Sequence, residues 1–249
     1  MTTGVELDGA TLTVLDKDGK EIDKWTSIKG EAHVIKYLEA GQTYTLREEF
    51  APYGYLKASD VTFTVEDTKE VQKVQMKDEV PTALLIVNKK GEFLDKVTLF
   101  DRAKGTVEHL FEYITGNLTE VTFEVYAAED IKVADGVSED YFKADELVAT
   151  ITTDENGIAQ IGELPVGKYY VKEAETAHGY VLDGEPRYVD LSYRDQDTPV
   201  VTYDEAWQNN RQKVKVTVLK RKKTPNEFWQ AVSSDCLQGR ISKMWAVMS

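Results

Sequence analysis

The sequence is poor in the residues from which many catalytic and metal sites are built. It has one cysteine, Cys236, and three scattered histidines, His33, His109 and His178, among 249 residues. A single cysteine excludes an internal disulfide framework and a cysteine-built zinc site. The scattered histidines argue against a histidine-built metal centre or catalytic triad.

Long apolar runs and positive charge are also scarce. No apolar run approaches the roughly 20 residues that a membrane helix needs. The N-terminus, MTTGVELDGA, has neither the basic nor the apolar region of a secretory signal. Acidic residues outnumber basic residues 44 to 30, which gives a net charge of -14. Such a chain repels a phosphate backbone, so nucleic acid is excluded as a favoured partner.

The composition that remains is that of a globular protein, with 41% hydrophobic and 30% charged residues. It contains no glycine-rich phosphate loop, nucleophile elbow or paired catalytic histidine. We therefore expect a protein that is not an enzyme, with no cofactor and no bound metal.

Most of the first 221 residues alternate short strand patterns with turns. The strand candidates are rich in β-branched and aromatic residues, and several alternate with period two. They are residues 11–15, 44–46, 61–65, 84–87, 121–127, 148–152, 168–173, 188–193 and 214–219. Their spacing of roughly 8–12 residues is typical of antiparallel β-sandwiches. Within 105–116, Val107, Leu110, Phe111 and Ile114 share one face of a 3.6-residue period, which predicts a short helix.

The chain also repeats itself. The segment LEAGQTYTLRE, residues 38–48, is matched by LPVGKYYVKE, residues 164–173, so that Glu48 corresponds to Glu173. A Gly-Tyr pair follows each glutamate at the same distance and ends at Tyr55 and Tyr180 respectively. We infer tandem repeats of one fold.

A second spacing has the same register. Asp78 precedes Lys89 by eleven residues, and Asn209 precedes Lys220 by eleven residues. Each pair consists of an acid or amide and a lysine, and each marks a junction where one unit ends and the next begins. This places one boundary near residue 80 and another near Arg211.

These motifs resemble the Cna B-type domains, also called SpaA-type or prealbumin-like domains. The resemblance rests on EEFAPYGY at 48–55, VTFEVYAAEDI at 121–131, TDENGIAQIGELPVGKYYVKE at 153–173 and an asparagine before a terminal strand. It covers roughly residues 5–221. The second copy departs from the signature at 176–178, Thr-Ala-His, where Ala-Pro-x is usual. Domains of this family build the stalks of Gram-positive adhesins and pilins.

The resemblance implies a compact β-sandwich and, in many members, an isopeptide bond between a lysine and an asparagine or aspartate. Carried over to this sequence, the lysine is Lys89, the acceptor is Asn209, and Glu173 is the glutamate that shuttles protons. Burial favours the neutral forms of a lysine and a carboxylic acid, so Lys89 becomes a nucleophile and Glu173 a hydrogen-bond donor. Attack on Asn209 then releases ammonia.

Two alternatives stay open for the nucleophile. Lys90 is the competing lysine and lies on the opposite strand face, but the alignment of LIVNK with VTVLK places Lys89 opposite Lys220. The other alternative is that both lysines are solvated strand-end residues and that Glu173 is a surface acid. We choose Lys89.

The first repeat has the acid and the acceptor but not the amine. Glu48 is the equivalent of Glu173, and Asp78 is the candidate acceptor. No lysine precedes Lys17, so the first strand, which carries the nucleophile in the family, is expected to be absent. Asp78 and Lys220 are therefore expected to be unpaired equivalents, and we interpret Met1 as an internal or artefactual start and the chain as a fragment.

The last residues differ from the rest. Residues 224–249 contain Trp229, Trp245 and Cys236 but no strand alternation and no match to the repeat. We interpret the tail, 222–249, as the frame-shifted start of a third repeat; the alternative is an amphipathic helix that binds a partner.

Together these observations predict tandem all-β antiparallel sandwiches of prealbumin-like, Ig-like type. The expected domains are 1–80, which lacks its first strand, and 81–221, with a helical insertion near 91–118. The expected function is that of a stalk or spacer in an extracellular, cell-wall-anchored surface protein, whose partners are neighbouring repeats. The alternative is a module that binds a host matrix protein or a glycan, with the 91–118 insertion as the binding face. No membrane contact is expected of this segment.

Overall fold

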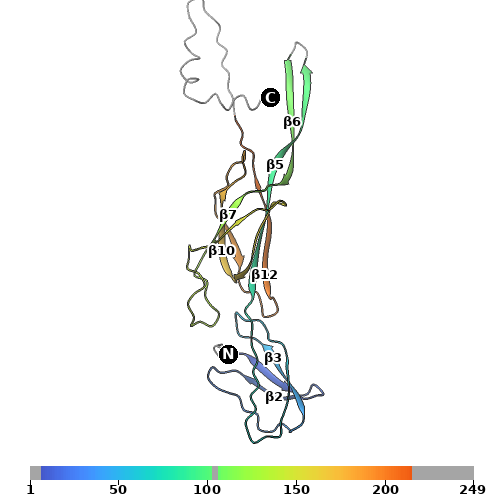
Figure 1. Ribbon diagram of the computed structural model, residues 1–249, viewed down its shortest axis with the longest axis vertical. Helices are drawn as coiled ribbons and strands as arrows, with labels where there is room; N and C mark the ends of the chain where they lie inside the picture. Colours follow the sequence, from blue (N-terminus) through green and yellow to red (C-terminus); the bar gives the residue numbers. More distant parts are fainter. Residues whose placement is uncertain (1–6, 103–105, 215–249) are drawn as a thin grey trace, which may run out of the picture. The chain divides into compact units, whose positions relative to one another are not determined.

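The computed structural model describes residues 7–102 and 106–214, and every regular element in this part of the chain is a β-strand (Figure 1). The strands are β1 (Thr11–Leu15), β2 (Glu21–Thr26), β3 (Thr43–Phe50), β4 (Val61–Thr64), β5 (Thr82–Arg102), β6 (Thr106–Asn117), β7 (Thr122–Ala127), β8 (Leu147–Thr152), β9 (Ile158–Pro165), β10 (Gly167–Glu175), β11 (Arg187–Leu191) and β12 (Val200–Asn209). The all-β class predicted from the sequence is confirmed.

The first repeat, residues 7–80, contains one antiparallel sheet in the order β2-β1-β3-β4. The tight turn between β1 and β2 forms because the Asp16 side chain accepts hydrogen bonds from the backbone N–H groups of Asp18 and Lys20. Gly19 takes a φ of 78° there, which favours glycine. Three buried apolar side chains, Val14, Tyr44 and Leu46, form the centre of this core.

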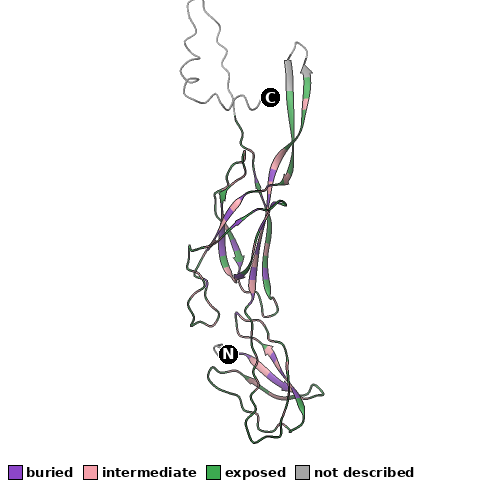
Figure 2. Ribbon diagram, viewed as in Figure 1, coloured by how far each residue is buried: buried purple, intermediate pink, exposed green. Residues whose placement is uncertain are grey.

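The second repeat, residues 81–212, is a sandwich of two sheets. One sheet has the order β11-β10-β7-β8 and is antiparallel throughout. In the other, β5 pairs with β12 in parallel and with β9 and β6 antiparallel. Eighteen buried apolar residues form its core, and Figure 2 shows buried positions alternating along the paired strands.

The two repeats share one sheet topology. The order β2-β1-β3-β4 in the first repeat corresponds to β8-β7-β10-β11 in the second. In this correspondence Leu12 pairs with Glu48, as Phe123 pairs with Glu173. Residues that correspond in the sequence repeat therefore also occupy equivalent positions in the paired strands of the two repeats. The exact domain limits, 1–80 and 81–221, stay a prediction.

The predicted helix at 105–116, within the insertion at 91–118, is wrong. Residues 106–117 form β6, which pairs with the second half of β5 as a long hairpin. The spacing of Leu110, Phe111 and Ile114 fits a helix, but the segment also alternates along a strand, and pairing with the β-branched residues of β5 satisfies its backbone.

Nine segments were expected to form strands. Eight of them lie within the described residues, and each of these eight contains a strand. The ninth, 214–219, and the tail, 222–249, fall outside the described residues apart from Val214. The sequence patterns did not predict β2, β9 or β12 as strands. No helix in the described part is long and apolar enough to cross a membrane.

Candidate functional site

Three buried polar side chains meet in the core of the second repeat. Lys89 continues the inward-facing row of Ala83, Leu85 and Val87 on β5, and all four are at most 1% exposed. Glu173 ends the corresponding row on β10 in the facing sheet and is 5% exposed. Asn209 is the last residue of β12, beside β5, and is 1% exposed.

The glutamate lies between the lysine and the asparagine. Lys89 Nζ donates a hydrogen bond to Glu173 Oε2 at 2.6 Å. Asn209 Nδ2 donates a second hydrogen bond to Glu173 Oε1. The structure thus brings together the three residues that the repeat register singled out, and one carboxyl group bridges the amine and the amide.

An aromatic side chain borders this cluster. The ring of Phe123 on β7 lies 5.4 Å from Lys89 Nζ. Burial lowers the pKa of Lys89, against the opposing effect of the hydrogen bond and charge of Glu173. A lysine that loses its proton more easily is a better nucleophile.

Thr176 is a member of the site that sequence reasoning missed. Its hydroxyl Oγ1 accepts a hydrogen bond of 2.7 Å from Asn209 Nδ2, whereas Asn209 Oδ1 is buried with no hydrogen-bond partner in the described structure. Thr176 stands three residues after Glu173, where the first repeat has Ala51. The departure from the Ala-Pro-x signature was visible in the sequence, but only the fold places this hydroxyl on the acceptor amide.

The motif tyrosine Tyr180 fixes the strand that carries Lys89. Its hydroxyl donates to the backbone oxygen of Glu92 at 2.8 Å. Its ring also packs directly on Gly91, where an added Cβ would lie 2.7 Å from Tyr180 Cε1. Only glycine permits this approach, two residues after Lys89.

The competing lysine, Lys90, points to the other side of β5. It is only half-buried, and its Nζ donates to Asn117 Oδ1 at 2.6 Å. Lys220 lies outside the described residues.

The first repeat brings its two carboxyl groups together without a lysine between them. Glu48 is 1% exposed, and its Oε2 accepts a hydrogen bond of 2.7 Å from the backbone N–H of Ala58. Burial, followed by the charge of Glu48 and a hydrogen bond with it, raises the pKa of Asp78 to about 6.

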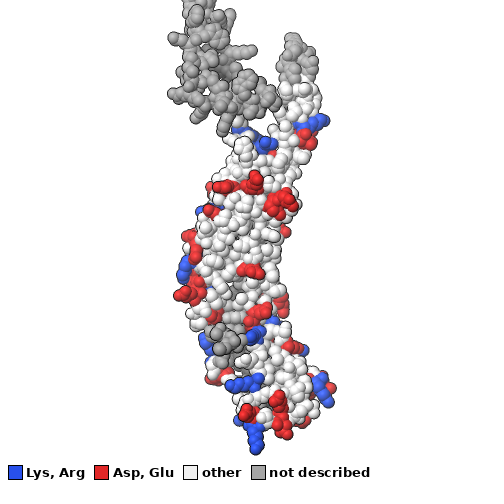
Figure 3. All heavy atoms as spheres, in the orientation of Figure 1, with Lys and Arg blue, Asp and Glu red and all other residues white. Residues whose placement is uncertain are grey.

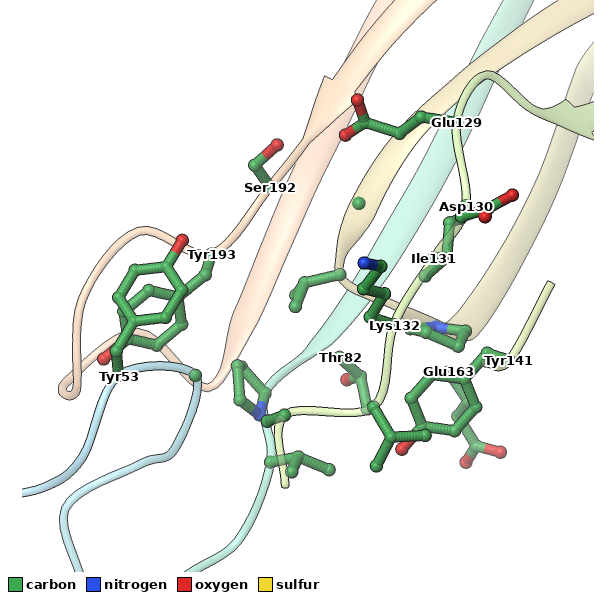
Figure 4. A pocket seen from close by; sticks show the side chains of 18 residues that line it. Tyr53, Thr82, Glu129, Asp130, Ile131, Lys132, Tyr141, Glu163, Ser192 and Tyr193 are labelled. Atoms are coloured by element: carbon green, nitrogen blue, oxygen red, sulfur yellow. The ribbon is translucent and has the colours of Figure 1, made fainter. Parts of the chain in front are cut away.

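A cavity of about 480 Å³ is lined by residues of both repeats, among them Tyr53, Val80 and Tyr193. Figure 4 shows Tyr53 beside Tyr193, with Glu129, Asp130 and Tyr141 along its rim. The rings of Tyr53 and Tyr193 meet edge to face at 4.8 Å. No group of three or more metal-ligating side chains occurs within residues 7–102 and 106–214.

The two-sheet sandwich with a polar cluster at its centre defines a prealbumin-like β-sandwich protein. The family model described as "SpaA: Prealbumin-like fold domain" matches residues 1–80 and 113–207. The chain therefore belongs to the SpaA family. No curated protein sequence matches the chain.

One of the similar solved structures has a TM-score above 0.5 and shows the same fold. The Bacillus anthracis TIE protein is 23% identical with a TM-score of 0.51, over 84% of this chain and 32% of that chain. This chain thus spans about a third of the length of the TIE protein. The minor pilin GBS52 of Streptococcus agalactiae matches at 16% identity and a TM-score of 0.36, over 87% of this chain and 89% of that chain. The shaft pilin SpaA of Lactobacillus rhamnosus GG matches at 13% identity and a TM-score of 0.32, over 84% of this chain and 90% of that chain.

Proposed function

We propose that this chain is a structural spacer of a bacterial surface protein, and that its second repeat is stiffened by an isopeptide bond between Lys89 Nζ and Asn209 Cγ. The observation that supports this most strongly is the buried contact of Lys89, Glu173 and Asn209. Membership of the SpaA family and the resemblance to stalk domains support the spacer role and an extracellular, cell-wall-anchored location.

The bond forms in steps that balance. A proton moves from the Lys89 ammonium to Glu173, which leaves a neutral amine and a neutral acid. The amine attacks Asn209 Cγ, Glu173 gives its proton to the leaving nitrogen and takes one from the attacking nitrogen, and the C–Nδ2 bond then breaks. One amide bond replaces another, and one ammonia leaves. Because Glu173 already contacts both the amine and the amide, no further catalyst is needed.

The orientation of the acceptor amide bears on its activation. A half-turn about the Cβ–Cγ bond of Asn209 exchanges its nitrogen and oxygen. Oδ1 would then lie where Nδ2 now lies, 2.7 Å from Thr176 Oγ1 and beside Glu173. Protonated Glu173 and the Thr176 hydroxyl would both donate to Oδ1, which stabilises the negative charge that develops there during attack.

The energetics of burial favour a chemical role over a purely structural one. A buried lysine–glutamate pair adds little net stability, because the loss of hydration offsets the attraction. A covalent link, in contrast, adds substantial stability to the folded state. Closing the 120 residues that separate position 89 from position 209 stabilises the fold by about 5 kcal/mol on the chain-entropy treatment of disulfides.

Intact mass of the full chain tests the cross-link. We expect a mass lower than that of the plain sequence by one ammonia, and we expect Lys89→Ala and Glu173→Ala to restore the full mass. Lys90→Ala is the matched control and should keep the loss. A full mass in well-folded wild-type protein would refute the assignment.

A second candidate function is the binding of a host protein by the hairpin of β5 and β6. Cross-strand pairing places Leu94 beside Tyr113 and Val97 beside Phe111 on one face, and each is at least 41% exposed. Figure 3 shows few charged side chains on the visible part of this hairpin. A binding screen of the full chain against host matrix proteins, with Phe111→Asp as the control, separates a binder from a spacer.

A further inference from the structure

A second charged pair lies near the Lys89 cluster. Arg187, the first residue of β11, donates a hydrogen bond from Nη2 to Asp183 Oδ2 at 2.7 Å. Its guanidinium carbon Cζ lies 4.7 Å from the centre of the Trp207 ring, which is the geometry of a cation–π contact. Asp183 and Asn209 line the same cavity, of about 310 Å³. The Arg187–Asp183 pair therefore lies beside the site, next to the acceptor amide.

Two aromatic rings link this pair to the lysine. The Trp207 ring meets the Phe123 ring edge to face at 5.6 Å, and the Phe123 ring lies 5.4 Å from Lys89 Nζ. Both rings belong to the buried core. A charge acts more strongly through such a medium than through water, because the local dielectric constant is lower. The guanidinium is thus placed to act on the amine across the two rings.

The first repeat shows what the same positions hold when no buried lysine is present in the described structure. Phe123 corresponds to Leu12, because each pairs with the buried glutamate of its repeat. Arg187 corresponds to Val61, because each pairs with the residue that stands two before that glutamate. An apolar side chain therefore replaces both the ring and the cation.

The third position follows the same pattern. Trp207 stands two residues before Asn209, as Met76 stands two residues before Asp78. Met76 packs against an apolar core together with the other two first-repeat side chains. Since the first repeat folds with apolar residues at all three positions, the fold itself does not require a cation there. The arginine accompanies the repeat that holds the buried lysine.

The charges that act on Lys89 have opposite effects. Burial is the main cause of the lowered pKa of Lys89, and Glu173 on β10 opposes it. The charge of Arg187 on β11 lowers this pKa further, whereas the charge of Asp183, just before β11, raises it. The side chains that β7 and β12 bring to the site, an aromatic ring and an amide, are uncharged.

We propose that Arg187 is a positioning residue of the cross-linking site: held on Trp207 and paired with Asp183, it places a permanent positive charge across the aromatic rings from Lys89 and so disfavours the ammonium form. The inference rests on the proposed function, because it assigns Arg187 a role in that reaction. An arginine suits this role since its guanidinium stays charged at every pH at which the protein is folded.

The consequence is a shift in the pH range of the reaction. The reactive form of the Lys89–Glu173 pair carries one proton. With two protons the amine is an ammonium, and with none Glu173 cannot protonate the leaving nitrogen. A nearby positive charge weakens the binding of both protons, so it moves both limbs of the rate profile to lower pH. A nearby negative charge moves both limbs to higher pH.

The pH dependence of the cross-linking rate tests this in the full chain. Insoluble chain, dissolved in urea before it has folded, is diluted into buffers from about pH 5 to about pH 9. Samples quenched in acid are weighed for the loss of one ammonia.

Two variants should shift the profile in opposite directions. Arg187→Met keeps an unbranched side chain over Trp207 but removes the charge, so its profile should move to higher pH. Asp183→Asn removes the opposing charge, so its profile should move to lower pH. The two side chains are 41% and 35% exposed, so water screens them and each shift should be about 0.3 to 1 pH unit. Arg187→Lys is the matched control and should stay close to the wild-type profile.

The outcomes separate this inference from the proposed function. If wild type loses ammonia and both variants keep its pH profile, the inference is overturned and the proposed function stands. A slower reaction of Arg187→Met without a shift would overturn it as well, since Arg187 would then only support the fold. Folded wild type that keeps its ammonia would refute the proposed function and the inference with it.

Circular dichroism in the same buffers shows whether each variant folds. If Arg187→Met does not fold, the Asp183→Asn profile decides. A shift to lower pH would support the inference, whereas no shift or a shift to higher pH would overturn it.

Discussion

Burial, rather than residue type, distinguishes Lys89 from Lys90. The two lysines are neighbours in sequence, but β-strand geometry sends one into the core and the other to the surface. The inward side chain donates to a carboxyl group that also accepts a hydrogen bond from the Asn209 amide, whereas Lys90 donates to Asn117. At the scale of single residues, the chemistry proposed here depends on this alternation and on the hydroxyl of Thr176.

Removal of the Thr176 hydroxyl should slow the cross-link. In Thr176→Val the acceptor amide loses one donor, and loss of a donor to a developing oxyanion costs about 10²-fold or more in established cases. We expect a slowing of at least about tenfold. Thr176→Ser is the matched control and should react at close to the wild-type rate. Cell-free synthesis, with samples quenched in acid and weighed by mass spectrometry, gives the rates. Equal rates for the valine and serine chains would exclude a role for the hydroxyl.

The lowered pKa of Lys89 predicts a pH-dependent stability when the bond is prevented. In Asn209→Ala, burial disfavours the charged form of Lys89 in the folded chain and lowers its pKa. In the unfolded chain, the pKa of Lys89 is near the ordinary value of 10.5. Between the two pKa values the unfolded state binds more protons, so the free energy of unfolding should rise with pH through that window.

Urea unfolding of this variant from about pH 7 to about pH 10 measures the slope. Addition of Lys89→Met removes the titrating group, so the double variant should show a flatter profile. A slope that is unchanged in the double variant would show that Lys89 is not its source.

At the scale of elements, the sequence predicted the strands that have alternating β-branched residues. It did not predict some of the strands that pair with them. β2 (EIDKWT) has three charged residues among six, and β12 (VVTYDEAWQN) has Asp204-Glu205 in its middle, so pairing with β1 and β5 rather than apolar pattern makes them strands. The β5–β6 hairpin was mistaken for a helix because its apolar residues satisfy both periods. Repeat register located Lys89, Glu173 and Asn209, but it could not locate Thr176, whose contact with Asn209 depends on the approach of β10 and β12.

The outer part of the β5–β6 hairpin should be dispensable for the cross-link. Lys89 is held by backbone hydrogen bonds to Gly157 and Leu118, at the base of the hairpin. Replacement of residues 95–112 by Asn-Gly, a two-residue turn between the paired Leu94 and Tyr113, should keep the ammonia loss. It should also raise solubility by removing exposed apolar side chains. Loss of the cross-link in a folded deletion variant would show that the hairpin organises the site.

At the scale of the whole molecule, the two repeats differ in the size of their cores. Eighteen buried apolar residues hold the second repeat, and three hold the first. In the full chain, proteolysis should therefore cut within residues 7–80 at least about tenfold faster than within 81–212. Mass analysis of the fragments over time gives both rates. Equal resistance would show that the first repeat is complete without a further strand.

Pulling a single molecule from its two ends tests the central claim, a spacer locked by its own covalent bond, most directly. If Lys89 and Asn209 are joined, force bypasses the residues between them, and the second repeat should not extend. In Glu173→Ala the same 120 residues should pull out and add about 400 Å, at about 3.5 Å per residue. A wild-type chain that extends through this region as far as the Glu173→Ala chain would contradict the proposal.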